Sequence, residues 1–260
     1  MWEWIEQGWY WLAVLAFCAG LIDAAVGGGG LIQIPALFSA FPQTNAATLF
    51  GTNKFASMVG TSSAVWSYLR RVRLPWGVIA PAMLAAFVCS FAGAATVALI
   101  PRQVLQPIVL VLLIIMAVYT LWKKDFGRLH LPTAVGTRER VLAIVAGGVI
   151  GFYDGLFGPG TGSFLIFVFI RLFAFDFIHA SASAKLVNLS TNIAALAFFV
   201  PNGHVLWQIA LVMALCNMAG ALVGTQLALR QGTGFIRVLF LLLLVVLIGR
   251  MAWGMFTPSI

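Results

Sequence analysis

Apolar residues run along the chain in long tracts that are separated by short polar or glycine-rich breaks. The first tract covers residues 9–41, which is 33 residues, whereas one membrane-spanning helix needs only about 20. It is interrupted by Gly27-Gly28-Gly29-Gly30, and glycine permits backbone angles that are closed to other residues. The pattern therefore predicts a broken helix or a helical hairpin, followed by helices over residues 46–69, 76–100 and 103–122.

The second half of the chain repeats this plan at a constant offset of 131 residues, the separation of Asp23 from Asp154. The same offset pairs Gly27 with Gly158, Lys54 with Lys185 and Trp76 with Trp207, without a gap. We therefore expect an all-α membrane protein made of two homologous four-segment repeats, residues 1–122 and 141–260, joined by a basic connector over residues 123–140. In the second repeat, the broken tract covers residues 141–173, and the predicted helices cover residues 177–200, 205–229 and 235–256.

Composition places these repeats in a membrane. Hydrophobic residues make up 62% of the 260 residues, charged residues make up only 8%, and the mean hydropathy is +1.03. A soluble domain of this size could not cover its surface with so few charges. The formal net charge of +8 does not indicate a nucleic-acid partner, because the basic residues lie in short clusters between apolar tracts rather than on one face. We expect the lipid bilayer as the surroundings and no nucleic acid as a partner.

Charges in the loops predict how the chain is oriented. Lys and Arg accumulate in cytoplasmic loops, so the loop at Arg70–Arg73, the connector and the Arg230–Arg237 loop are expected in the cytoplasm. The loop over residues 201–204 has no Lys or Arg and is expected outside, although its equivalent at 70–73 is inside. The repeats would then be inverted relative to each other, which requires each glycine-broken tract to return to the side from which it entered. A parallel repeat of simple spans is the alternative.

The glycine breaks are candidate binding elements. Backbone groups freed at bilayer depth are tolerated where they are buried in protein or line a wet cavity. Helix N-termini favour anions through their N–H groups and their partial positive charge. The candidate ligands at the breaks are Gly28, Gly29 and Gly30 in the first repeat and Gly160 and Thr161 in the second. Close packing between helices through small residues is the alternative role.

Lys54 and Lys185 lie within apolar helices at equivalent positions of the two repeats. A charge at the centre of a transmembrane helix costs roughly 2.5–3.5 kcal/mol on insertion scales, which makes each lysine a candidate ligand for an anionic substrate. A structural ion pair with Asp23 or Asp154 is a second interpretation, and a side chain that extends to the membrane interface is a third. The two aspartates could instead take up protons, because burial favours the neutral form of a carboxyl group.

Hydroxyl and amide side chains recur on the turns around both lysines. Many hydrogen-bond donors with few negative charges suit a small oxyanion, although part of this polarity could serve hydrogen bonds between helices. The candidate substrate ligands of this kind are Thr52, Asn53 and Ser57 in the first repeat and Ser183 and Asn188 in the second.

At these residues the chain resembles the TauE/SafE family of sulfite exporters and anion permeases. The matching features are the glycine-rich break followed by Pro35 and an apolar run, the Gly51-Thr52-Asn53-Lys54 stretch and the duplication of the whole unit. The second repeat departs from the pattern at Gly158-Pro159-Gly160-Thr161-Gly162 and at Ala182-Ser183-Ala184-Lys185, so the two half-sites are not expected to be equivalent. The resemblance covers essentially the full chain. It implies transport, usually export, of sulfite, sulfonates or related anions by a multi-pass protein of the cell inner membrane.

We therefore expect a secondary transporter of small sulfur-containing or organic anions that works by alternating access. An intramembrane enzyme is the less favoured interpretation, because the sequence has no HExxH or CxxC motif and no Ser/His pairing, and its three histidines are too scattered for a metal site. A membrane scaffold or assembly subunit would not need charged residues at matching positions in both repeats. No cofactor or metal is expected, and a homo-oligomer is compatible with the sequence.

Overall fold

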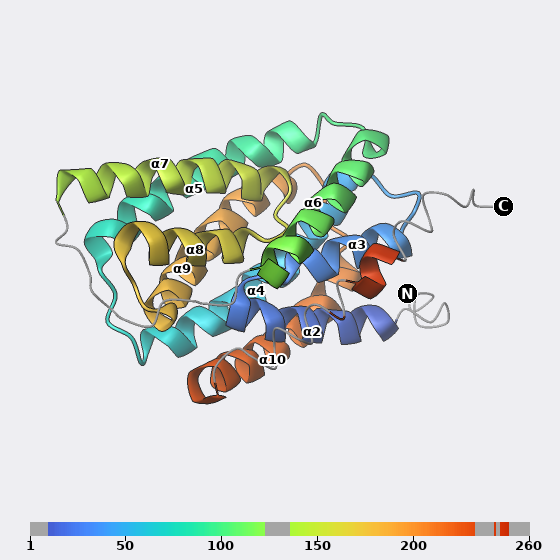
Figure 1. Cartoon of the computed structure of the whole chain (residues 1–260). Coiled ribbons are helices and arrows are strands. Elements are labelled where there is room, and N and C mark those ends of the chain that lie inside the picture. The colour runs from blue at the N-terminus through green and yellow to red at the C-terminus, as the bar shows by residue number, and fades with distance from the viewer. Residues whose placement is uncertain (1–9, 123–135, 232–241, 243–244, 250–260) are drawn as a thin grey trace.

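The computed structural model describes residues 10–122, 136–231, 242 and 245–249, and all regular elements in these residues are helices (Figure 1). The all-α prediction is confirmed for this part of the chain. The first repeat forms α2 (Tyr10–Val26), α3 (Gly30–Ala40), α4 (Ala46–Leu69), α5 (Trp76–Val97) and α6 (Arg102–Trp122). The second repeat forms α7 (Thr137–Leu156), α8 (Thr161–Phe173), α9 (Phe177–Phe199) and α10 (Trp207–Gln231). Most of the predicted connector and of the helix predicted over residues 235–256 lies outside the described residues.

Both glycine breaks are the turns of helical hairpins rather than kinks in one span. At the first turn, Gly29 packs back against α2, where a Cβ atom would lie 2.7 Å from the Cβ atom of Asp23. The turns also use positive φ angles, 81° at Gly27, 85° at Gly158 and 81° at Gly160, which glycine adopts without strain. As a result, α3 runs back beside α2, and α8 runs back beside α7 (Figure 1).

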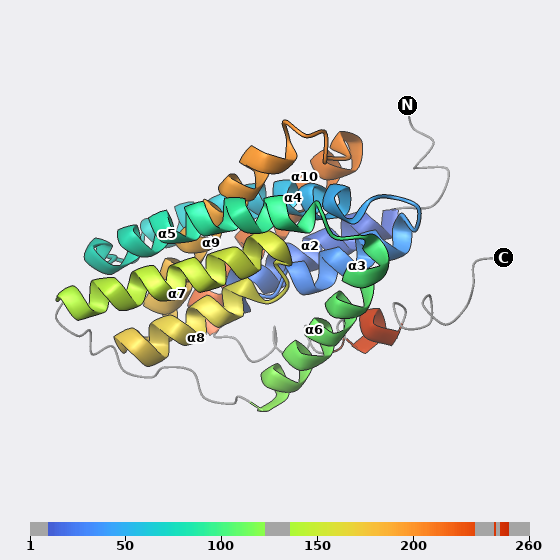
Figure 2. The ribbon, with the colours of Figure 1, turned by 90° about the horizontal axis from the view of Figure 1, so that it is seen from above.

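The two hairpins reach the centre of the molecule from opposite ends and meet tip to tip (Figure 1, Figure 2). The backbone N–H of Ser163 donates to the carbonyl of Gly27 at 2.9 Å, and its hydroxyl donates to the carbonyl of Val26 at 2.8 Å. The backbones touch because both sides lack a side chain: a Cβ atom at Gly162 would lie 2.6 Å from the Cα atom of Gly27. The glycines therefore serve the turn and also the contact between the repeats.

The longer helices hold the hairpins in place by packing across the repeats. α5 packs along α7, α10 packs along α2, and α4 and α9 contact each other between the hairpins. Small residues bring these helices close, since Gly151 of α7 lies against the backbone of Ala86 in α5, and Gly220 of α10 lies against the backbone of Phe17 in α2. Gly20, the equivalent of Gly151, packs in the same way on α10. Small residues therefore let these helix pairs pack with their backbones in contact.

Two described helices, equivalent in the two repeats, are long and apolar enough to cross a membrane. Trp76–Val97 has 22 residues with a mean hydropathy of 2.0, and Trp207–Arg230 has 24 residues with a mean hydropathy of 1.6. Their outer faces carry exposed leucines, among them Leu84 of α5 and Leu215 of α10, at equivalent positions. A water-facing surface would not favour such residues in quantity, whereas lipid does.

Candidate functional site

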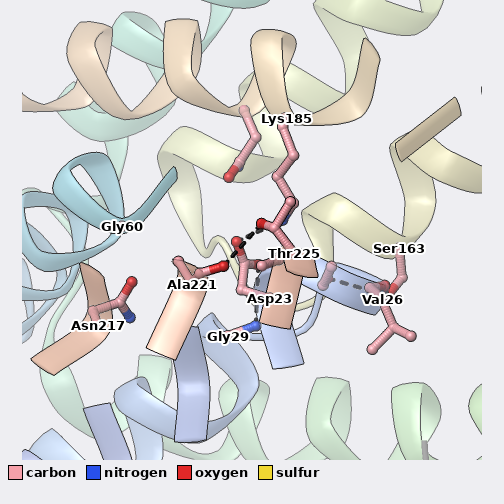
Figure 3. A network of polar contacts seen from close by, with 12 residues as sticks. Asp23, Val26, Gly29, Gly60, Ser163, Lys185, Asn217, Ala221 and Thr225 are labelled. Atoms are coloured by element: carbon pink, nitrogen blue, oxygen red, sulfur yellow. Dashed lines mark hydrogen bonds and ion pairs between the residues drawn. The ribbon is translucent and has the colours of Figure 1, made fainter. Parts of the chain in front are cut away.

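Two ion pairs connect the repeats at the centre of the molecule. The Nζ atom of Lys54 in α4 donates to Oδ2 of Asp154 in α7 at 2.6 Å. The Nζ atom of Lys185 in α9 donates to Oδ2 of Asp23 in α2, also at 2.6 Å (Figure 3). Each lysine therefore pairs with the aspartate of the other repeat. Both lysines are buried, with exposed fractions of 2% and 0%, so neither side chain extends to the membrane interface.

The aspartates occupy these places because each lies in the last turn of a helix that ends at a glycine turn. Asp23 also accepts the backbone N–H of Gly29 at its Oδ1 atom, at 3.2 Å (Figure 3). A carboxylate is favoured there, because the N-terminus of α3 presents N–H groups that have no intrahelical acceptor. At the second turn, a Cβ atom on Gly158 would lie 3.3 Å from Nζ of Lys54 and 3.5 Å from Oδ1 of Asp154. Glycine at this position leaves the space around the ion pair open.

A small polar cavity lies between the two hairpin tips and the crossing helices α4 and α9. Its volume is about 20 Å³, which is room for about one water molecule. It is lined by Asp23, Gly27, Gly30, Asn53, Lys54, Ser57, Asp154, Gly158, Gly160, Thr161, Gly162, Asn188 and Asn192. The lining comes from both repeats, from the two hairpins (α2–α3 and α7–α8) and from α4 and α9.

Hydrogen-bonding groups of the backbone and of side chains line this cavity. In the described part of the chain, the first-turn N–H groups of Gly30 in α3 and Gly162 in α8 have no protein acceptor. Asn53 is only 3% exposed, and its Oδ1 atom, a hydrogen-bond acceptor, has no partner in the described residues. Asn192 donates to Oδ1 of Asn188 across one helical turn, at 3.4 Å. Unsatisfied buried polar groups of this kind are uncommon and indicate a ligand or a water site.

Most of the ligands predicted from the sequence are brought together at this cavity. Those that line it are Gly30, Asn53, Lys54, Ser57, Gly160, Thr161 and Asn188, together with Asp23 and Asp154. Gly28, Gly29, Thr52, Ser183 and Lys185 do not line it. Gly29 and Lys185 instead donate hydrogen bonds to the two carboxylate oxygens of Asp23, Gly29 to Oδ1 and Lys185 to Oδ2.

The hydroxyls of Thr52 and Ser183 are engaged elsewhere. Thr52 donates to the carbonyl of Thr48 at 2.7 Å and accepts the backbone N–H of Leu206 at 3.0 Å, which ties α4 to the chain just before α10. Ser183 donates to the carbonyl of His179 at 2.7 Å. Both side chains therefore satisfy backbone groups of the helices in this conformation.

Four lining residues were not among the predicted ligands: Gly27, Gly158, Gly162 and Asn192. Asn192 lies one helical turn after Asn188, so a search for polar residues at i,i+4 spacing could have found it. The three glycines flank glycines that were predicted, but nothing in the sequence distinguishes a glycine at the cavity from one at the turn.

Comparisons with known proteins agree on one family. The family model of "Sulfite exporter TauE/SafE" matches residues 12–251. "Probable membrane transporter protein ORF9" of Sinorhizobium sp is 37% identical over 237 residues, which cover 91% of this chain and 89% of that protein. "Probable membrane transporter protein YfcA" of Escherichia coli (strain K12) is 36% identical over 231 residues, which cover 87% of this chain and 82% of that protein.

A third relative, "Probable membrane transporter protein" of Haemophilus influenzae, is 30% identical over 243 residues, which are 93% of both chains. No solved structure matches the chain. The family match and the near-complete coverage of these relatives extend over both hairpins and both ion pairs. The chain therefore belongs to the TauE/SafE family and is a membrane transporter.

Proposed function

We propose that the protein exports small sulfur-containing or organic oxyanions, such as sulfite or a sulfonate, by alternating access. The observation that carries the proposal is the cavity between the two hairpin tips, lined by the unpaired N–H groups of Gly30 and Gly162 and by Lys54. An oxyanion accepts several hydrogen bonds at once, and the N-termini of α3 and α8 supply donors and partial positive charge toward the same space. The choice of sulfite or sulfonates draws on the description of the family, since the relatives are named only as membrane transporters.

The arrangement of the hairpins supports inverted repeats in a multi-pass protein of the inner membrane. One hairpin enters the molecule from each end, which is the arrangement that inverted repeats produce (Figure 1). Arginines in the described residues gather at the end from which α7 and α8 enter: the α4–α5 loop, the start of α7, the end of α8 and the end of α10 carry Arg70, Arg71, Arg73, Arg138, Arg140, Arg171 and Arg230. By the positive-inside rule this end faces the cytoplasm.

At the opposite end the described residues contain one arginine, Arg102, and it has a structural use. Its guanidinium donates to the carbonyls of Phe38 and Phe41 at 2.8 Å and of Thr44 at 2.6 Å, so it caps the end of α3. Its position therefore does not weaken the orientation inferred from the other arginines.

The small size of the cavity supports alternating access. A space for about one water is too small for sulfite, so binding of the anion requires the hairpin tips to separate. Movement of one hairpin, together with the long helix packed along it, against the other hairpin would open the cavity toward one side of the membrane at a time. The Ser163 contacts with Val26 and Gly27 would then form and break in each cycle.

Flux in proteoliposomes tests the proposed function, with sulfite, thiosulfate, taurine and sulfoacetate as solutes. Asn53→Ala removes a side-chain amide that lines the cavity and should slow the transported solute at least tenfold. The Lys54→Met, Lys185→Met double variant should abolish flux. Ser62→Ala is the matched control, because Ser62 is exposed on the same helix and bonds only to the carbonyl of Met58. Equal flux in the wild type and the Asn53 variant, or no flux of any oxyanion in the wild type, would contradict the proposal.

A reporter fused after Ile260 tests the inverted orientation separately. With the α7–α8 end of the molecule in the cytoplasm, α10 returns to that side, and one crossing by the helix that the sequence predicts over residues 235–256 would place the C-terminus outside. A cytoplasmic C-terminus would contradict inverted repeats and would favour parallel repeats of simple spans.

A further inference from the structure

The charges at the cavity are balanced before any substrate binds. Lys54, Asp23 and Asp154 line the cavity, and Lys185 contacts Asp23, so two cations face two carboxylates and the formal charge is zero. A monovalent anion added to this group would leave one uncompensated negative charge among largely buried residues. Burial of an unpaired charge carries a large free-energy cost, so a further positive charge must arrive with the anion or a negative one must be neutralised.

The two ion pairs are not equivalent, and only one of them faces the cavity with both partners. Lys54 and Asp154 both line it, and each is the hydrogen-bond partner of the other. Asp23 is held by Lys185 and also by the N–H of Gly29, and Lys185 does not line the cavity. The Lys185–Asp23 pair therefore fixes the first hairpin, whereas the Lys54–Asp154 pair can open toward a bound anion.

We propose that Asp154 binds one proton for each anion that Lys54 binds, so that the protein moves an anion and a proton together. This inference rests on the proposed anion transport. A proton from water forms one O–H bond on the carboxylate, which becomes a neutral acid and releases the ammonium group of Lys54. The ammonium group then binds the anion, and the formal charge of the site returns to zero. On the other side the anion leaves, the proton returns to water and the ion pair forms again.

The charged groups around Asp154 favour binding and release of the proton at this one carboxylate. α4 supplies Lys54, α2 supplies Asp23, and α9 supplies Lys185, while the neighbouring Tyr153 of α7 donates its hydroxyl to the carbonyl of Pro159 at 2.6 Å. The titratable groups of α5 and α8 lie elsewhere: Cys89 is beside Gly148, and Arg171 is at the far end of α8. Among the described residues, Asp154 thus forms its ion pair with Lys54, and this cation can change partner.

This coupling determines what drives the movement. For a monovalent anion the loaded and the empty site are both neutral, so the membrane voltage does no work on the cycle. Net movement follows the sum of the anion gradient and the pH gradient. The protein then exports when the anion accumulates inside, and it takes up the same anion from an acidic medium.

Wild-type protein in proteoliposomes, with the voltage held at zero by potassium and valinomycin, gives the first test. The solutes are the four used for flux plus methanesulfonate, which keeps a charge of −1 over the whole pH range, and a trapped pH dye reports proton movement. A gradient of one pH unit, acid outside, should concentrate a monovalent anion about tenfold inside, with one proton per anion. Protein-free vesicles correct for diffusion of the neutral acids.

Asp154→Asn gives the second test, because it keeps the shape of the side chain and cannot bind the proton. Its remaining anion movement should carry no protons and should respond to voltage, whereas Ser62→Ala should retain the wild-type ratio. If this variant does not fold, the ratio of protons to anions moved by the wild type still tests the coupling. Anion flux without protons in the wild type overturns the coupling and leaves the proposed function intact, whereas no anion flux of any kind overturns both.

Discussion

Removal of the lysine should cost more stability at Lys54 than at Lys185, although the two are equivalent in sequence. Both ion pairs have the same N–O distance of 2.6 Å. The aspartates differ, because Asp154 is 1% exposed whereas Asp23 is 19% exposed and keeps the Gly29 N–H after its lysine is gone. Methionine has a similar length without the charge, so each substitution mainly leaves a carboxylate without its cation.

The expected magnitudes follow from these surroundings. Loss of one partner from a fully buried ion pair costs about 3–5 kcal/mol, which we expect for Lys54→Met. For Lys185→Met we expect roughly 1–3 kcal/mol, because partial solvent access and one charge-assisted hydrogen bond still support Asp23. Replacement of a buried pair by uncharged residues is often nearly neutral, so Asp154→Asn in the Lys54→Met background should recover most of the loss.

Thermal unfolding in detergent, followed by the fraction of monodisperse protein after heating, measures these differences at fixed pH. The expected fall in midpoint is on the order of 10 °C for Lys54→Met and about half of that for Lys185→Met. Equal midpoints for the two single variants would refute the argument from exposure. A double variant no more stable than Lys54→Met would refute the ion pair as the cause.

Two further predictions concern buried positions away from the lysines. Gln33 is completely buried in α3 and neither amide atom has a partner, so Gln33→Leu should raise the free energy of unfolding by about 1–3 kcal/mol; a lower thermal midpoint would contradict this. Gly162→Ala should separate the hairpin tips, because its Cβ atom would lie 2.6 Å from the Cα atom of Gly27, and should lower stability by more than about 2 kcal/mol. Gly148→Ala is the matched control within a helix, since its Cβ atom would meet only the sulfur of Cys89 at 3.4 Å, and it should be neutral or stabilise by up to about 1 kcal/mol.

Much of the fold follows from the sequence because each cause is local. The helices follow from the apolar tracts, and the constant offset of 131 residues shows that each element of one repeat has an equivalent in the other. The glycine runs predicted a break but did not decide between a hairpin and a kinked span. That choice depends on the positive φ angles at Gly27 and Gly158 and on the close approach of Gly29 to α2, which are properties of the folded chain.

The site could be predicted only in part, for a related reason. Lys54 and Lys185, and likewise Asp23 and Asp154, were recognised as charges at equivalent positions of the repeats. Which lysine pairs with which aspartate depends on how the two hairpins lie relative to each other. Thr52 and Ser183 show the limit for uncharged residues, because a hydroxyl on a helix can face a cavity or bond to the carbonyl one turn earlier, and here both do the latter. Residue type alone does not distinguish these two uses.

The crossed ion pairs also constrain how the protein is made. Lys54 is synthesised 100 residues before Asp154, and Asp23 is synthesised 162 residues before Lys185. When the first repeat reaches the membrane, neither of its two central charges can yet form the contact that it has in the finished protein. A chain that stops after residue 122 therefore keeps a lysine and an aspartate without their final partners, and such a half should be a substrate for quality-control proteases unless a second repeat is supplied. Co-expression of the two halves as separate chains should then protect both, because each half supplies the countercharges that the other lacks.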